Sequence, residues 1–153
     1  DFMSFQKAHS ISNELGEVVV QSVEDDLNAG TGQLLLTPPP QFKSYRVLEL
    51  GIVTTNATAS TGVDITFGTA SAGVQFVGSG TPVTFAIAAE LGAKYSTAGA
   101  FDFNAAGTGS VDAGGIPKLE KGQSIWFNVT GVASAATNAI AFARLAPETE
   151  YQD

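Results

Sequence analysis

Cysteine is absent from the 153-residue chain, and His9 is the only histidine. Without cysteine there is no disulfide framework and no thiolate chemistry. A transition-metal site needs several His or Cys ligands, and a Ser-His-Asp triad needs a histidine beside its nucleophile. Because the single histidine lies in a polar N-terminal stretch, we expect no metal site, no cofactor and no catalytic residue.

Charge is sparse, and basic charge is the scarcer kind. Seven Lys and Arg stand against fifteen Asp and Glu, a formal net charge of −8. Binding to a nucleic-acid backbone requires clustered Lys and Arg, so nucleic acid is not an expected partner. No apolar run approaches the roughly 20 residues of a membrane-spanning helix, so a membrane is not expected either. The densest acidic cluster, Glu24-Asp25-Asp26, lacks the spacing of a calcium loop, and we interpret it as an acidic turn.

The remaining carboxylates are scattered through the middle of the chain. Two suitably placed carboxylates are enough for glycoside hydrolysis, so a glycan-cleaving enzyme is one alternative. However, residues 40–147 carry equal numbers of acidic and basic residues, which is typical of a solvated surface. We therefore expect a protein that is not an enzyme.

The acidic residues are concentrated at the two ends. Residues 1–39 carry a net charge of −5 and residues 148–153 a net charge of −3. The acidic ends favour either solubility or docking on a basic partner surface. The sequence divides into an N-terminal arm (1–16), one domain (17–147) and an acidic C-terminal tail (148–153).

Short runs that alternate between apolar and polar residues dominate the domain. Val63, Ile65 and Phe67 alternate with polar residues, the period of two expected of a half-buried strand. The longest run, Phe42–Thr55, is mostly apolar on both faces and favours a central strand. Further candidates are Glu17–Ser22, Gln33–Thr37, Val74–Val77 and Pro82–Ile87, with a helical turn over Ala86–Leu91 as an alternative. About eight to ten strands spaced roughly 8–12 residues apart predict an all-β fold, an antiparallel β-sandwich or jelly roll.

Residues 116–147 hold the only tryptophan and two strong strand patterns. Gln123–Val129 follows a turn at Lys118–Gly122 and alternates strictly, and Ala139–Leu145 alternates again. The small residues Gly131–Asn138 separate the two runs. We predict an antiparallel hairpin with a long loop, forming the central strand pair of the sandwich.

Two features suggest contact surfaces. Phe2, Met3 and Phe5 are apolar residues in the N-terminal arm, and they either pack onto the domain or anchor the arm to a neighbouring subunit. Trp126 lies on the strand face opposite Ile125. It suits packing, a subunit interface or a platform for stacking a sugar. These four residues are the candidate partner interface.

Residues 46–145 resemble the small structural proteins of tailed bacteriophage virions, particularly capsid decoration (cement) proteins. The likeness rests on the Gly/Ala/Thr-rich β domain with Val63–Ala70, the late strand KLEKGQSIWFNVTG and the closing strand AIAFAR. It implies a trimer or dimer on the outer capsid surface that stabilises the lattice by bridging major capsid protein subunits. The alternative is an adhesive or carbohydrate-binding β-sandwich module with Trp126 as its platform.

Overall fold

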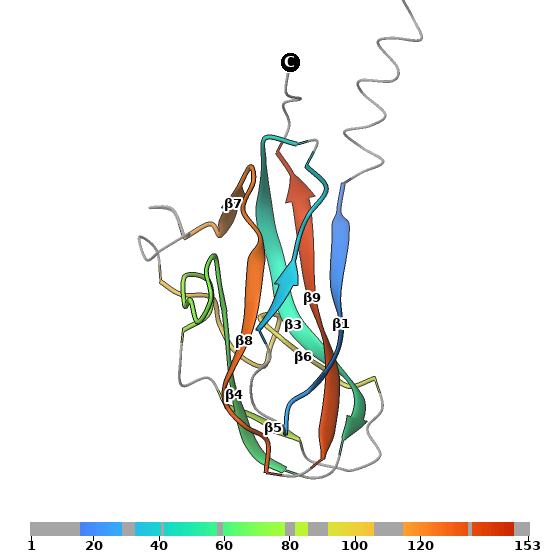
Figure 1. The fold of residues 1–153 in the computed structure, drawn as a ribbon. Helices are drawn as coiled ribbons and strands as arrows, with labels where there is room; N and C mark the ends of the chain where they lie inside the picture. Colours follow the sequence, from blue (N-terminus) through green and yellow to red (C-terminus); the bar gives the residue numbers. More distant parts are fainter. Residues whose placement is uncertain are drawn as a thin grey trace, which may run out of the picture.

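The computed structural model describes residues 16–28, 33–40, 42–57, 60–78, 82–85, 92–105, 115–134 and 136–148. These residues form two antiparallel sheets packed against each other, which confirms the predicted all-β sandwich (Figure 1). Phe2, Met3, Phe5 and most of the acidic tail lie outside the described residues, as does the alternative helical turn at 86–91.

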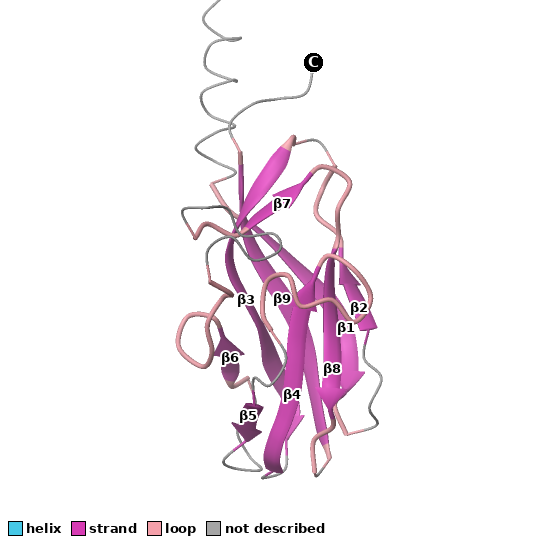
Figure 2. Ribbon diagram, turned by 90° about the vertical axis from the view of Figure 1, so that its left-hand side faces the viewer, coloured by secondary structure: helices cyan, strands magenta, loops and turns pink. Residues whose placement is uncertain are grey.

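In the described ranges nine strands make up the two sheets, and Figure 2 shows them turned by 90° from Figure 1, with β4 and β8 of one sheet in front of β3 and β9 of the other. They are β1 (Val18–Asp26), β2 (Gln33–Leu36), β3 (Ser44–Ala57), β4 (Ser60–Gly68), β5 (Pro82–Phe85), β6 (Lys94–Ser96), β7 (Lys118–Glu120), β8 (Ile125–Gly131) and β9 (Thr137–Pro147). Sheet A has the order β1-β9-β3-β6, with β7 paired to the beginning of β3. Sheet B has the order β2-β8-β4-β5.

The predicted hairpin between Gln123–Val129 and Ala139–Leu145 is wrong. Both runs form strands, but β8 lies in sheet B and β9 in sheet A. Each is a central strand of its own sheet: β8 pairs with β2 and β4, and β9 pairs with β1 and β3. The small-residue connection crosses between the sheets, so the inner faces of both strands can be buried against each other across the core.

Two predicted turns and one predicted strand are also corrected. Glu24-Asp25-Asp26 forms the end of β1, because these residues pair with the start of β9. Lys118–Glu120 forms β7, and the turn is confined to Lys121-Gly122, where Gly122 has a positive φ of 84°. In Val74–Val77, only Val77 pairs with a strand, in a single bridge to Phe67.

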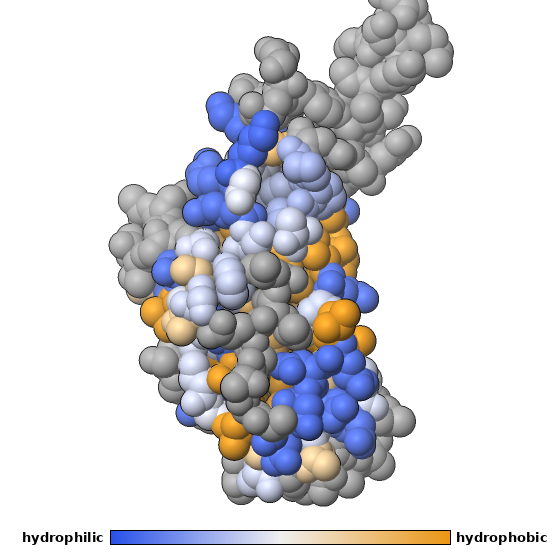
Figure 3. Space-filling model, in the orientation of Figure 1, coloured by the Kyte–Doolittle hydropathy of each residue, from blue (hydrophilic) through white to orange (hydrophobic). Residues whose placement is uncertain are grey.

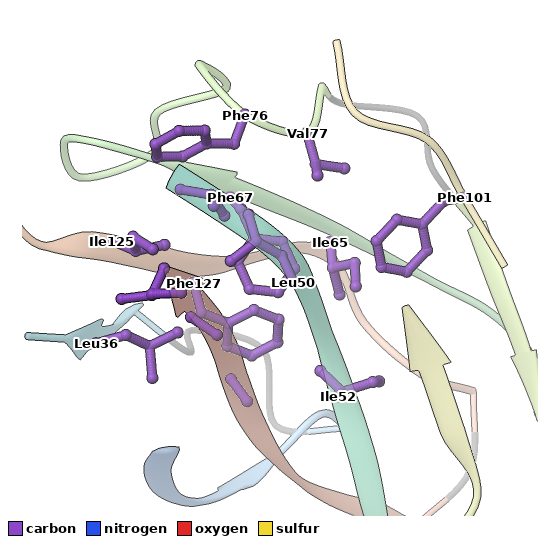
Figure 4. Close-up of a cluster of buried hydrophobic side chains, with 14 of the residues drawn as sticks. Leu36, Leu50, Ile52, Ile65, Phe67, Phe76, Val77, Phe101, Ile125 and Phe127 are labelled. Atoms are coloured by element: carbon purple, nitrogen blue, oxygen red, sulfur yellow. The ribbon is translucent and has the colours of Figure 1, made fainter. Parts of the chain in front are cut away.

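Large side chains of sheet B and β3 fill the core (Figure 4). Phe67 and Phe127 are cross-strand partners with ring centroids 5.2 Å apart. Along most of β9 the residues facing the core are small: Ala139, Ala141 and Ala143 are at most 1% exposed, and only beyond them does a large residue, Leu145, enter the core. Because alanines line this part of the core, the larger alternate residues of β9 lie on the outer face of sheet A.

A bulge in β3 decides which of its residues face the core. The register with β9 shifts between Val47 and Glu49, so the alternation of faces along β3 is interrupted at Leu48. Before the shift Tyr45 and Val47 are buried in the core, and beyond it Leu50 and Ile52 are. Glu49 is thereby placed on the outer face of sheet A.

Candidate functional site

An apolar hollow lies on the outer face of sheet A, at the centre of strands β1, β9, β3 and β6. Its volume is about 350 Å³, and it is lined by Val19, Gln21, Glu49, Val53, Lys94, Ile140, Phe142 and Arg144. That volume lies near the lower end of the roughly 300–1,000 Å³ typical of ligand pockets. Half of the lining residues are apolar, although this face lies outside the sandwich core.

The strand register arranges the hollow in three rows. In the first, Arg144 of β9 pairs with Val19 of β1 on one side and Glu49 of β3 on the other. In the second, Phe142 pairs with Gln21 and Gly51 in the same way. The third row has Ile140 between Glu24 and Val53, and Val53 pairs onward with Lys94. The middle of the hollow is therefore apolar, and charged groups flank it.

Phe142 forms part of the floor of the hollow. It is only 8% exposed, yet it is not part of the core cluster. Its cross-strand partner Gly51 has no side chain, and Ser96 of β6 lies against this position. Val19, one row away, is 56% exposed. The apolar lining thus extends from the nearly buried Phe142 to the solvent-exposed Val19.

Glu49 is a buried carboxylate held by three side chains. Its Oε2 atom accepts hydrogen bonds from Lys94 Nζ at 2.9 Å and Ser96 Oγ at 2.5 Å. Its Oε1 atom accepts one from Arg144 Nε at 3.2 Å. Arg144 also reaches Glu17, with 2.5 Å between Nη1 and Oε1. The side chain of Glu49 is 5% exposed, against 35% for Arg144 and 53% for Lys94, so the acid is buried while both bases reach solvent.

These contacts determine the ionisation of Glu49. Burial raises the pKa of this carboxyl group, but the hydrogen bonds from Ser96, Lys94 and Arg144 together outweigh burial, and the pKa of Glu49 is lowered. Burial opposes the charge of Arg144 as well, while its contacts with Glu49 and Glu17 raise the pKa of the guanidinium. Glu49 and Arg144 are therefore ionised at neutral pH, and their opposite charges attract each other.

Gly51 allows β6 to approach the sheet closely enough to bring Ser96 to Glu49. A Cβ atom at position 51 would lie 2.5 Å from Ser96 Cβ, 2.5 Å from the backbone oxygen of Tyr95 and 2.8 Å from Ser96 Cα. Real Cβ atoms do not make such contacts. The absence of a side chain at position 51 therefore lets Ser96 of β6 donate its hydrogen bond to Glu49.

The acidic end of β1 shows no convergence of carboxylates toward a metal ion. Glu24 accepts hydrogen bonds from Thr55 and Asn138, which lower the pKa of its carboxyl group. The carboxylate of Asp26 accepts from the backbone N–H of Asn28. Burial raises the pKa of Asp25, whose Oδ2 atom lacks a hydrogen-bond partner. Within the described residues, no group of three or more His, Cys, Asp or Glu is placed to hold a metal ion.

Trp126 lies away from this hollow, on the outer face of sheet B. It is half-buried, and its cross-strand partners are Leu35 and Gly68. On the same face, the side-chain oxygen of Asn128 accepts from the backbone of Ala72 at 3.0 Å, and its amide donates to Gly73 at 3.2 Å. The loop that follows β4 therefore covers part of this face beside the tryptophan.

Sequence reasoning did not identify the hollow. The sequence feature that could have indicated it is the alternation of Ile140, Phe142 and Arg144 with smaller residues along β9. This alternation shows that the strand has two different faces, but it does not show which face is buried in the core. Residues 17, 49, 94 and 144 are far apart in the chain, and only the strand register brings them together.

None of the described residues forms a helix long and apolar enough to cross a membrane. Comparisons of the chain with protein-family models, with curated proteins and with solved structures gave no match.

Proposed function

We propose that this chain is a non-enzymatic virion structural protein that binds the outer capsid surface and bridges neighbouring major capsid subunits. The observation that carries the proposal is that sheet A has apolar residues outside the core as well as in it, since Val19, Val53, Ile140 and Phe142 line the hollow on its outer face. Exposed apolar patches on folded domains mark sites of protein interaction. Figure 3, in the orientation of Figure 1, shows apolar surface along the side where β1 lies.

The sequence adds three further apolar residues at its N-terminal end. These residues, Phe2, Met3 and Phe5, come before β1 in the chain. The residue directly before β1, Glu17, forms an ion pair with Arg144. A stiff two-sheet domain carrying an apolar arm suits a protein that clamps neighbours. In this proposal the three arm residues contact the capsid, and Trp126 contacts another copy in a dimer or trimer.

Deleting residues 1–12 tests the role of the arm. We expect the variant to keep its fold by circular dichroism and to bind particles at least about tenfold more weakly, because each buried Phe or Met contributes roughly 1.5–3 kcal/mol. Co-sedimentation with native particles is the measurement. Val132→Thr is the control, since Val132 is an exposed apolar residue outside the strands and the arm. Undiminished binding by the deletion variant contradicts the proposal.

The alternative function, a carbohydrate-binding or adhesive module, is favoured by the partial exposure of Trp126 on an outer sheet face. If this residue stacks on a sugar, Trp126→Ala should weaken binding on a glycan array severalfold while the melting temperature stays near that of the native chain. Stacking on an aromatic ring contributes about 0.5–1.5 kcal/mol or more, enough to reduce a weak affinity severalfold. A native chain that binds no glycan eliminates this function.

A further inference from the structure

The hollow on sheet A is partly lined by β1, the strand that directly follows the N-terminal arm in the sequence. Val19 is 56% exposed and Val23, further along β1, is 73% exposed. Both lie on the strand that the N-terminal arm enters. This suggests that the cover for the hollow is part of the same chain.

The chain reaches the edge of the hollow where the arm begins. Val19 lines the hollow, and Glu17, two residues earlier, forms its ion pair with Arg144 on the hollow's border. An extended chain covers at most about 3.3–3.6 Å per residue, so the twelve residues from Glu17 back to Phe5 reach roughly 40 Å. Three rows of a sheet occupy far less, even after the arm reverses its direction.

Attachment favours the chain's own arm over that of a second molecule. A segment that is covalently joined close to its binding site has an effective concentration in the millimolar range there. A second copy at micromolar concentration competes poorly with it. Weak apolar contacts are therefore sufficient for the arm to occupy its own hollow.

The chemistry of the arm matches that of the hollow. Phe2, Met3 and Phe5 provide three large apolar side chains, and residues 1–12 have no net charge because Asp1 and Lys7 balance. Within the hollow, Glu49 is neutralised by its partners Lys94 and Arg144. Neither surface repels the other electrostatically, and the apolar contact dominates.

We propose that residues 1–12 cover the hollow of their own domain in the free protein, with Phe2, Met3 and Phe5 against the surface formed by Val19, Ile140 and Phe142. The arm is then shielded from water until a partner takes it up. This inference concerns the isolated chain and does not rest on the capsid proposal, because it is tested without particles.

The composition of the chain provides the test. Met3 is the only methionine, so isotope labelling of methionine methyl groups gives one arm signal in an NMR spectrum. The chain has no cysteine, so Val23→Cys places a single nitroxide spin label beside the hollow. Thr130→Cys, on the outer face of sheet B, is the matched control. We expect the Met3 signal to lose most of its intensity with the label at position 23 and to keep it with the label at position 130.

Two further measurements identify the occupant. Isotope-labelled chain without a spin label is mixed with unlabelled Val23→Cys carrying the nitroxide. The Met3 signal should then keep its intensity, because the contact is intramolecular. In the Val23→Cys background, the double substitution Val19→Thr and Ile140→Thr should restore the signal. The control pair Ile116→Thr and Val132→Thr, two exposed apolar residues elsewhere, should leave the signal weak.

The proposal is overturned if the label at position 23 leaves the Met3 signal unchanged, or if both label positions weaken it equally. Loss of intensity in the mixed sample also overturns it, since the occupant is then the arm of a second copy. The first comparison uses the otherwise native chain, so poor folding of the double variant would not affect the conclusion.

Discussion

Gly51→Ala is expected to destabilise the domain by about 3 kcal/mol, at the upper end of the usual cost of overpacking. The new methyl group would lie 2.5 Å from both Ser96 Cβ and the backbone oxygen of Tyr95. Neither belongs to the end of a flexible side chain, so β6 must move. That movement takes Ser96 away from Glu49 and adds the loss of a buried hydrogen bond to the steric cost.

Chemical denaturation with urea measures this loss of stability. Gly99→Ala is the matched control, because a Cβ at position 99 meets no atom within 4 Å and this position has no positive φ. It should leave the free energy of unfolding within about 0.5 kcal/mol of the native value. A Gly51→Ala variant as stable as the Gly99→Ala variant would show that β6 does not pack as described.

Glu49→Gln is expected to cost about 2 kcal/mol at pH 7. Removing one partner of a fully buried ion pair typically costs about 3–5 kcal/mol because the other charge is left unpaired. The effect is smaller here because the side chains of Arg144 and Lys94 are 35% and 53% exposed and can be hydrated. Glutamine keeps the shape of the side chain, so the change isolates the charge.

The stability difference between native and Glu49→Gln chains should depend on pH. The folded-state pKa of Glu49 lies below its ordinary value of 4.5. Its ionised form therefore contributes stability that is fully present above about pH 4.5 and is lost as pH falls through the folded-state pKa. Melting curves recorded from pH 7 down to strongly acidic pH should show the two chains converging.

Glu120→Gln is the control for this charge effect. Its side chain is 61% exposed and lies 3.9 Å from Lys118, so its removal should cost less than about 1 kcal/mol. A Glu49→Gln chain that matches the native chain at pH 7, or a difference that persists unchanged into acid, contradicts the assigned role of Glu49.

Alternation along the chain was a reliable guide to the strands. Ile125 and Phe127 are buried as their spacing predicts, and Trp126 between them lies on the opposite face. The hairpin prediction failed because alternation shows that a segment is a strand without showing its partner. Strand pairing depends on contacts between distant residues, such as Phe127 with Phe67.

The class of fold was determined by the sequence alone, because a period of two in short runs between glycine-bearing turns suits a sheet with one buried face. The identity of the buried face on β9 was decided by tertiary structure. Its alanines face the core because large residues of the other strands occupy that space, and Ile140 and Phe142 are left on the outer face. Only the register then places Glu49, Lys94 and Arg144 together, because cross-strand neighbours are set by pairing over the whole sheet and not by local propensity.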